Sequence, residues 1–222
     1  MGERTEDVHL VGCPRIDLVV EIMRDGTDGL SDKLFDAGVG GRFDLNEPFL
    51  IVSQHPVTTE YGDGEQQITE TLMAVERLGL PAIVLWPNAD AGAEHVARGI
   101  CKFRESHDCS RLHFFKNIPF ETYIALMVKA ASIVGNSSAA VREGALIGVP
   151  AVNVGTRQQG RQRGSNLVDV GYHRTAIADA IERQVKRGRY EGEPIYGDGQ
   201  AGERIAQVLS TCTIRLQKQI TY

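Results

Sequence analysis

The chain has 222 residues, of which 42% are hydrophobic and 24% are charged, and its formal net charge is −5. This is an ordinary globular composition, which excludes collagen, coiled coils and wholesale disorder. No run approaches the roughly 18 consecutive apolar residues of a membrane span. The acidic balance gives no general attraction to nucleic acid. We therefore expect neither a membrane nor a nucleic acid as partner.

The cysteines and histidines argue against disulfides and metal binding. A chain of this length does not need disulfides, and its four cysteines show no Cys-x-x-Cys spacing. They are Cys13, Cys101, Cys109 and Cys212. The six histidines include no His-x-x-x-His pair, and the first ten residues lack the apolar core of a secretory signal. These features predict reduced thiols, a cytoplasmic location, no metal and no cofactor.

The first 47 residues do not follow the pattern of the rest of the chain. Residues 8–20 are apolar but interrupted by a glycine and a proline, which predicts a strand end followed by a short helix. Residues 25–48 are rich in glycine and aspartate, which predicts a loop or short linker. We therefore expect residues 1–47 to be the remnant of an inter-domain region, followed by one domain over 48–209 and a C-terminal tail over 210–222.

From residue 48 onwards, short apolar strands alternate with helices. The strands are brief, mostly apolar runs, whereas the helices carry apolar residues every three or four positions. This alternation predicts an α/β fold built of βαβ units: a Rossmann-like parallel sheet of five or six strands with helices on both faces. The strands are expected at 49–53, 82–86, 112–115, 132–135 and 151–154, and the helices at 66–79, 93–104, 120–131, 139–147, 175–187 and 203–209.

Polar residues follow every one of these strands. In an open parallel sheet the ligand lies at the carboxyl ends of the strands, so these residues carry the functional prediction. A structural core alone does not require so many polar groups at one edge. The polar segments begin at Gln54, Pro87, Lys116, Asn136 and Gly155.

The segment after the strand at 132–135 suggests an anion site. Gly135 lets the chain turn sharply, and the small residues Ser137 and Ser138 leave the first helical amides free. Those amides and the helix dipole favour a negative group such as a phosphate. The alternative is that Asn136 or Ser137 simply caps the helix.

Glu143 lies further along the same helix, in an otherwise apolar stretch. A carboxylate accepts several hydrogen bonds and therefore suits the two hydroxyl groups of a ribose. The alternative is a capping or surface acid. Its neighbour Arg142 is expected to face elsewhere, as a solvated charge.

Residues 156–163 form a loop that contains Arg157, Arg161 and Arg163 together with glycine. Such loops are well suited to wrapping a diphosphate. A mobile basic surface loop is the alternative. Nucleic acid fits less well, because no aromatic side chain lies between the arginines.

His55 directly follows the strand at 49–53 and precedes Pro56, which restricts its backbone. A histidine at this edge can transfer a proton, or donate a hydrogen bond to a phosphate or a sugar. The alternative is a structural histidine whose ring is satisfied within the core.

These segments together resemble the nucleotide-binding domain of UDP-N-acetylglucosamine 2-epimerases. The resemblance runs from about residue 11 to residue 209, and it implies the C-terminal half of a glycosyltransferase-B type fold. The form SQHPVTT resembles the hydrolysing branch, whose members convert UDP-GlcNAc and water into N-acetylmannosamine and UDP for sialic-acid synthesis. Five motifs carry it in order: SQHPVTTE at 53–60, LWPNADAG at 85–92, NIPF at 117–120, GNSSAAVREGALIGVPAVNVGTRQQGRQRGSN at 135–166 and IYGDG at 195–199.

The resemblance also implies roles for individual residues after the first three motif strands. His55 would be catalytic, and it would face the diphosphate and sugar together with Asn88. Ile118 would offer its backbone groups to the uracil. Asp90 would shape its own loop more than it touches the ligand.

The remaining implied roles fall after the strand at 132–135 and the one that follows it. Ser137 and Ser138 would bind phosphate where the helix begins. Glu143 would hold the ribose hydroxyls. Arg157 would reach the substrate from the loop that follows.

Only the C-terminal domain of the family is matched. In the family the N-terminal domain supplies acid/base carboxylates and arginines, and epimerisation needs a base on one face of the sugar and an acid on the other. We therefore expect three partners: a UDP-sugar, an N-terminal domain or separate subunit that completes the site, and further copies of the chain, since family members commonly form oligomers. Three functions stay open: half of an epimerase, a non-catalytic UDP-sugar binding module, and a glycosyltransferase of similar fold.

Overall fold

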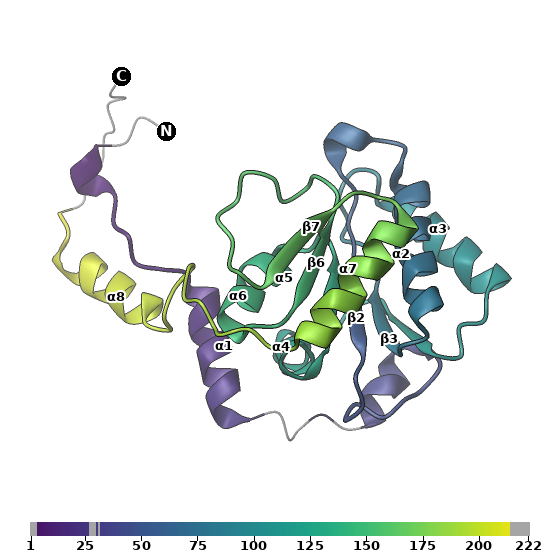
Figure 1. The fold of residues 1–222 in the computed structure, drawn as a ribbon. Helices are drawn as coiled ribbons and strands as arrows, with labels where there is room; N and C mark the ends of the chain where they lie inside the picture. The colour runs from purple at the N-terminus through teal and green to yellow at the C-terminus, as the bar shows by residue number, and fades with distance from the viewer. Residues whose placement is uncertain (1–3, 27–29, 31, 214–222) are drawn as a thin grey trace.

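The computed structural model describes residues 4–26, 30 and 32–213. Their strands form one seven-stranded sheet (Figure 1). The strand order is β1-β4-β3-β2-β5-β6-β7; β2 to β7 run parallel, and β1 pairs antiparallel with β4. This confirms the predicted Rossmann-like parallel sheet. The strands are β1 Val39–Gly40, β2 Leu50–Ser53, β3 Ala82–Leu85, β4 Leu112–Phe115, β5 Ser132–Gly135, β6 Ala151–Val154 and β7 Leu167–Val170.

Helices cover both faces of the sheet. The α-helices are α1 Pro14–Asp25, α2 Gly64–Leu78, α3 Ala93–Ser106, α4 Phe120–Lys129, α5 Ser138–Val141, α6 Glu143–Ile147, α7 Arg174–Arg187 and α8 Ala201–Thr211, and short 3-10 helices occur at Thr5–Asp7, Asp32–Ala37 and Thr58–Glu60. The apolar residues of α2, α3 and α7 pack in one cluster, and those of α1, α4 and α6 pack in a second. Figure 1 shows α8 beside α1 at one end of the molecule, away from α2 and α3.

Strands β2 to β6 are apolar on both sides because each contributes to both clusters. In β2, Leu50 and Val52 belong to one cluster and Ile51 to the other, and all three are fully buried. Side chains of successive strand residues point to opposite faces, so a strand between two helical layers needs apolar residues at every position. This is why continuous apolar runs identified the central strands.

Outside the sheet centre the predictions were less complete. β7 was missed because it is an edge strand whose residues are only partly buried, so its apolar pattern is weak. Part of the predicted linker 25–48 is ordered as a 3-10 helix and as β1 on the opposite edge. The strand end expected before α1 was wrong, since residues 8–12 carry no strand. Most of the tail at 210–222 lies outside the described residues, and among those described no helix is long and apolar enough to cross a bilayer.

The strand order decides where the site lies. β2 is followed along the chain by β3 on one side, whereas its other neighbour, β5, comes only after β4 and α4. The connections therefore change direction between β2 and β5. Open α/β sheets leave a crevice for ligands at the carboxyl ends of two such strands.

Gly135, the last residue of β5, packs closely against the end of β2, so we expect its substitution to destabilise the fold. Its φ is +124°, and a Cβ atom there would overlap the carbonyl oxygen of Ser53. We expect Gly135→Ala to lower the free energy of unfolding by at least about 2 kcal/mol, from the unfavourable φ and the backbone overlap. Urea denaturation measures this, and the matched control is Gly171→Ala, where a Cβ would have no atom within 4 Å. An unchanged midpoint for Gly135→Ala would contradict the close approach.

Candidate functional site

A cavity of about 270 Å³ opens at the carboxyl ends of the strands. Its walls come from the segments after β2, β3, β4 and β5, with a contribution from the start of α1. Every residue predicted for the site lines it except Arg157, which lies in the loop after β6. Those lining residues are His55, Asn88, Ile118, Ser137, Ser138 and Glu143.

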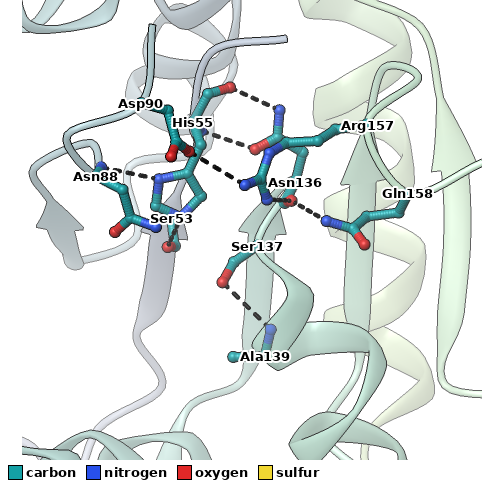
Figure 2. Close-up of polar contacts among 9 residues, drawn as sticks. All are labelled: Ser53, His55, Asn88, Asp90, Asn136, Ser137, Ala139, Arg157 and Gln158. Carbon is teal, nitrogen blue, oxygen red and sulfur yellow. Dashed lines mark hydrogen bonds and ion pairs between the residues drawn. The ribbon is translucent and has the colours of Figure 1, made fainter. Parts of the chain in front are cut away.

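The side chain of Asn136 fixes the backbone of His55. Its Oδ1 accepts from the N–H of His55 at 2.7 Å, and its Nδ2 donates to the carbonyl of His55 at 2.9 Å (Figure 2). Asn136 is fully buried, so these bonds are shielded from water. These two hydrogen bonds continue the pairing of β2 and β5 beyond its last residues, Ser53 and Gly135. The side-chain amide of Asn136 replaces the backbone groups that would make such bonds within a sheet.

The ring of His55 is held in one orientation. Its Nδ1 accepts from the backbone N–H of Asn88 at 3.1 Å, so in the neutral ring the proton sits on Nε2. Nε2 lies 3.5 Å from the hydroxyl of Ser53 (Figure 2). Burial, and after it the charge of Arg157, lowers the pKa of His55 to about 4, although Asp90 opposes the shift. At neutral pH the ring is therefore an uncharged donor through Nε2.

Ser137 acts as the helix cap that was considered as an alternative. Its Oγ accepts from the N–H of Ala139 at 3.3 Å (Figure 2). The helix predicted at 139–147 is divided, because Arg142 has φ −90° and ψ −69° and separates α5 from α6. Ser137 and Ser138 still line the cavity. A dipole contribution at this point comes from a single short turn and not from a long helix.

Glu143 is a buried carboxylate and not a surface acid. It is 1% exposed, and its Oε1 accepts from Nε of Arg15 at 3.0 Å and from Nη2 of Arg142 at 3.2 Å. Its Oε2 is also buried and has no partner among the described residues. Arg142 was expected to be solvated; this was wrong, because its side chain lines the cavity and pairs with Glu143. Paired arginines are what a buried carboxylate requires.

The arginine loop after β6 is anchored by Arg157. It forms an ion pair with Asp90 at 3.3 Å and donates to the carbonyl of Asn136 at 3.3 Å (Figure 2). Gln158 donates to the same carbonyl at 2.7 Å. These contacts attach the loop to the turn that carries His55 and Ser137. The mobile basic surface loop considered as an alternative does not describe this end of the segment.

A second network fixes the same loop through Glu60, the last residue of the SQHPVTTE motif. Its carboxylate accepts from the hydroxyl of Thr156, from Tyr172 at 2.6 Å and from Gln67 at 2.7 Å. Burial acts to raise the pKa of Glu60, but these three hydrogen bonds outweigh it and lower the pKa overall. Glu60 thus stays ionised and ties the segment after β2 to the segments after β6 and β7.

Several residues that line the cavity were not found from the sequence. Trp86 directly follows β3, so its position at a strand end could have signalled it, whereas Lys116 was placed in a polar strand-end segment but was given no role. Tyr123 lies one turn after Phe120 on α4, and burial raises its pKa to about 12. Arg15 had no local signal, because it is 128 residues away from Glu143 in the chain.

The chain matches one family model, described as UDP-N-acetylglucosamine 2-epimerase, over residues 1–210. The chain belongs to the UDP-N-acetylglucosamine 2-epimerase family. It is 30% identical to a UDP-N-acetylglucosamine 2-epimerase of Neisseria meningitidis over 225 residues, which cover 99% of this chain and 56% of that protein. It is 28% identical to the UDP-N,N'-diacetylbacillosamine 2-epimerase (hydrolyzing) of Legionella pneumophila, covering 98% of this chain and 55% of that protein.

Solved structures of the UDP-N-acetylglucosamine 2-epimerase family share the fold. The Neisseria meningitidis enzyme bound to UDP-GlcNAc superposes with a TM-score of 0.70 at 15% identity, covering 95% of this chain and 57% of that one. The Methanocaldococcus jannaschii enzyme in complex with UDP-GlcNAc and UDP gives 0.67 at 15% identity, over 94% and 56%. The chain therefore spans little more than half the length of these family members.

The burial of His55 predicts the pH at which its ring titrates and how the stability of the fold depends on pH. Its pKa is about 4 in the folded chain against a usual 6.5, so between these values the unfolded chain binds more protons. The contribution of the neutral His55 ring to the free energy of unfolding is therefore fully present above pH 6.5 and is lost as the pH falls to 4. NMR of the ring should show titration near pH 4, and His55→Gln should flatten the fall in unfolding free energy over this range. Titration near pH 6.5 would contradict the buried, Nε2-protonated ring.

Proposed function

We propose that this chain is the UDP-sugar-binding half of a hydrolysing UDP-GlcNAc 2-epimerase, which forms N-acetylmannosamine and UDP for sialic-acid synthesis. The observation that carries the proposal is the buried Glu143 with one unpartnered oxygen in a cavity that His55 also lines. A ribose hydroxyl is the kind of donor that such an oxygen lacks. Two similar proteins support the hydrolysing reaction, since the Legionella pneumophila and Campylobacter jejuni relatives are both named as hydrolysing 2-epimerases.

In this proposal the nucleotide spans the cavity from Ile118 to His55. The backbone of Ile118 binds the uracil, and Oε2 of Glu143 accepts from the ribose. Ser137 and Ser138 receive the phosphates. These residues all line one cavity, and the order of the contacts is the one that the family resemblance implies.

Next to the sugar, the proposal assigns roles to His55, Asn88 and Arg157. The neutral ring of His55 donates through Nε2 to the sugar–diphosphate linkage, and the backbone of Asn88 keeps it in that tautomer. Arg157 exchanges its ion pair with Asp90 for the diphosphate, whose negative charge grows as UDP leaves. His55 acts from one face of the sugar only.

The second acid or base of the reaction comes from outside the described residues. Glu143 is occupied by two arginines, and inverting C2 needs groups on opposite faces of the sugar. We propose that the polypeptide corresponding to the rest of the family's length supplies them, from the same chain or from a separate subunit. A non-catalytic UDP-sugar binding module is the second candidate, since the described residues place one unpaired carboxylate oxygen and one neutral histidine in the cavity but no second carboxylate or histidine.

Binding without turnover is the direct test of the proposal. We expect the 222-residue chain to bind UDP in calorimetry and to release no N-acetylmannosamine from UDP-GlcNAc. Adding the N-terminal portion of a related enzyme should restore turnover if the chain is half of an epimerase, and should not if it is a binding module. An absence of UDP binding would refute both, and turnover by the chain alone would refute the need for a second half.

Glu143→Ala tests the ribose contact. We expect UDP binding to weaken by about 1–3 kcal/mol, because ribose hydroxyls are left without an acceptor in a buried site. Glu143→Gln keeps the volume of the side chain and controls for repacking around the two arginines. Glu121→Ala, at an exposed position on α4, is the matched surface control. Unchanged affinity in both Glu143 variants would remove this residue from the site.

A further inference from the structure

Arg15 reaches the cavity from a part of the chain that supplied none of the predicted site residues. It is the second residue of α1, after Pro14, and its Nε donates to Oε1 of Glu143 at 3.0 Å. Its guanidinium also lies over the ring of Phe120, 3.9 Å from the centroid. Phe120 begins α4, directly after the segment that contains Ile118. Arg15 therefore stands between the proposed uracil side and the proposed ribose side of the cavity.

The position of Arg15 is fixed by the C-terminal part of the described chain. On the same helix, the carboxylate of Asp17 accepts from the N–H of Ala201 at 3.0 Å and from that of Gly202 at 2.7 Å, and so caps α8. Just before α1, the N–H of Cys13 donates to the carbonyl of Tyr196 at 2.9 Å. These bonds anchor both sides of Arg15. A long side chain on a frayed helix end would not hold a fixed partner.

The two carboxylate oxygens of Glu143 have different surroundings. Oε1 accepts from Arg15 and Arg142, whereas Oε2 is buried, faces no donor among the described residues and belongs to a residue that lines the cavity. Arg142 is the residue before Glu143 and lies between α5 and α6. Arg15 comes from α1, 128 residues away in the chain, so its bond fixes the rotation of the carboxylate from a separate element. Without it, either oxygen could turn toward Arg142.

We propose that Arg15 is a positioning residue for ribose recognition: it holds Oε1 of Glu143 so that Oε2 faces the nucleotide and accepts from the ribose hydroxyls. This rests on the proposed binding of UDP at this site. A 2′-deoxyribose offers one donor fewer, so the chain discriminates UDP from 2′-deoxy-UDP, and Arg15 sets how strongly it does so. A residue that only stabilised the fold would alter both affinities alike.

The experiment measures the ratio of the dissociation constants for 2′-deoxy-UDP and UDP by calorimetry. The parent chain should prefer UDP by about tenfold or more, the value of one hydrogen bond to a charged acceptor. In Arg15→Met, which keeps an apolar stem over Phe120 but has no donor, the ratio should fall to about threefold or less. Arg15→Lys, which restores the charge and a donor, should recover part of the ratio. Arg24→Ala, at an exposed position near the end of α1, should leave it unchanged.

The possible outcomes separate the inference from the function on which it rests. A parent chain that does not bind UDP overturns both. A parent that prefers UDP, with the same ratio in Arg15→Met, overturns the role of Arg15 and leaves the nucleotide site in place. Equal weakening of both ligands in Arg15→Met also overturns it, since that is the effect of a structural residue. Should Arg15→Met fail to fold, the same ratio measured in Arg15→Leu, which also lacks a donor, decides, and retention of the parental ratio overturns the proposal.

Discussion

The pairing of Asn136 with the backbone of His55 is the contact on which the site depends. Each side-chain amide group of Asn136 meets one backbone group of His55, and the same residue's carbonyl accepts from Arg157 and Gln158. The bonds join the ends of β2, β5 and β6 at the point where the sheet connections change direction. A buried polar group without a partner is costly, so an Asn in this position has few alternatives to the geometry observed. The edge of the sheet that carries the candidate site is thereby built as one unit.

Burial then determines the chemistry available to each charged group. The uncharged ring of His55 and the ionised carboxylate of Glu60 lie on the same motif, yet desolvation dominates at one and hydrogen bonding at the other. Glu143 combines almost complete burial with two arginine partners, and its Oε2 has no partner among the described residues. Of the buried side-chain atoms without a partner in the described part of the chain, it is the carboxylate oxygen of a residue that lines the cavity.

The candidate groups are distributed unevenly over the molecule. All the candidate groups lie at one edge of the sheet, and the chain covers 56% and 57% of two family members of known structure. Arg15 at the start of α1 and Phe120 after β4 line the cavity, and Asp17 on α1 accepts from the start of α8, so α8 supports the helix that carries Arg15.

The sequence by itself determined the order and type of the central elements and six of the residues that line the cavity. Strands buried on both faces need continuous apolar runs, and the residues after parallel strands must meet at one edge, so both features are local. Edge elements such as β7, and the break of the helix at Arg142, escaped because partial burial and a local backbone kink leave little pattern. Only the tertiary structure decided that β5 lies beside β2, that Arg157 donates to the carbonyl of Asn136, and that Arg15 pairs with Glu143. These outcomes depend on contacts between residues far apart in the chain, whose energies are set by burial and geometry that no local pattern contains.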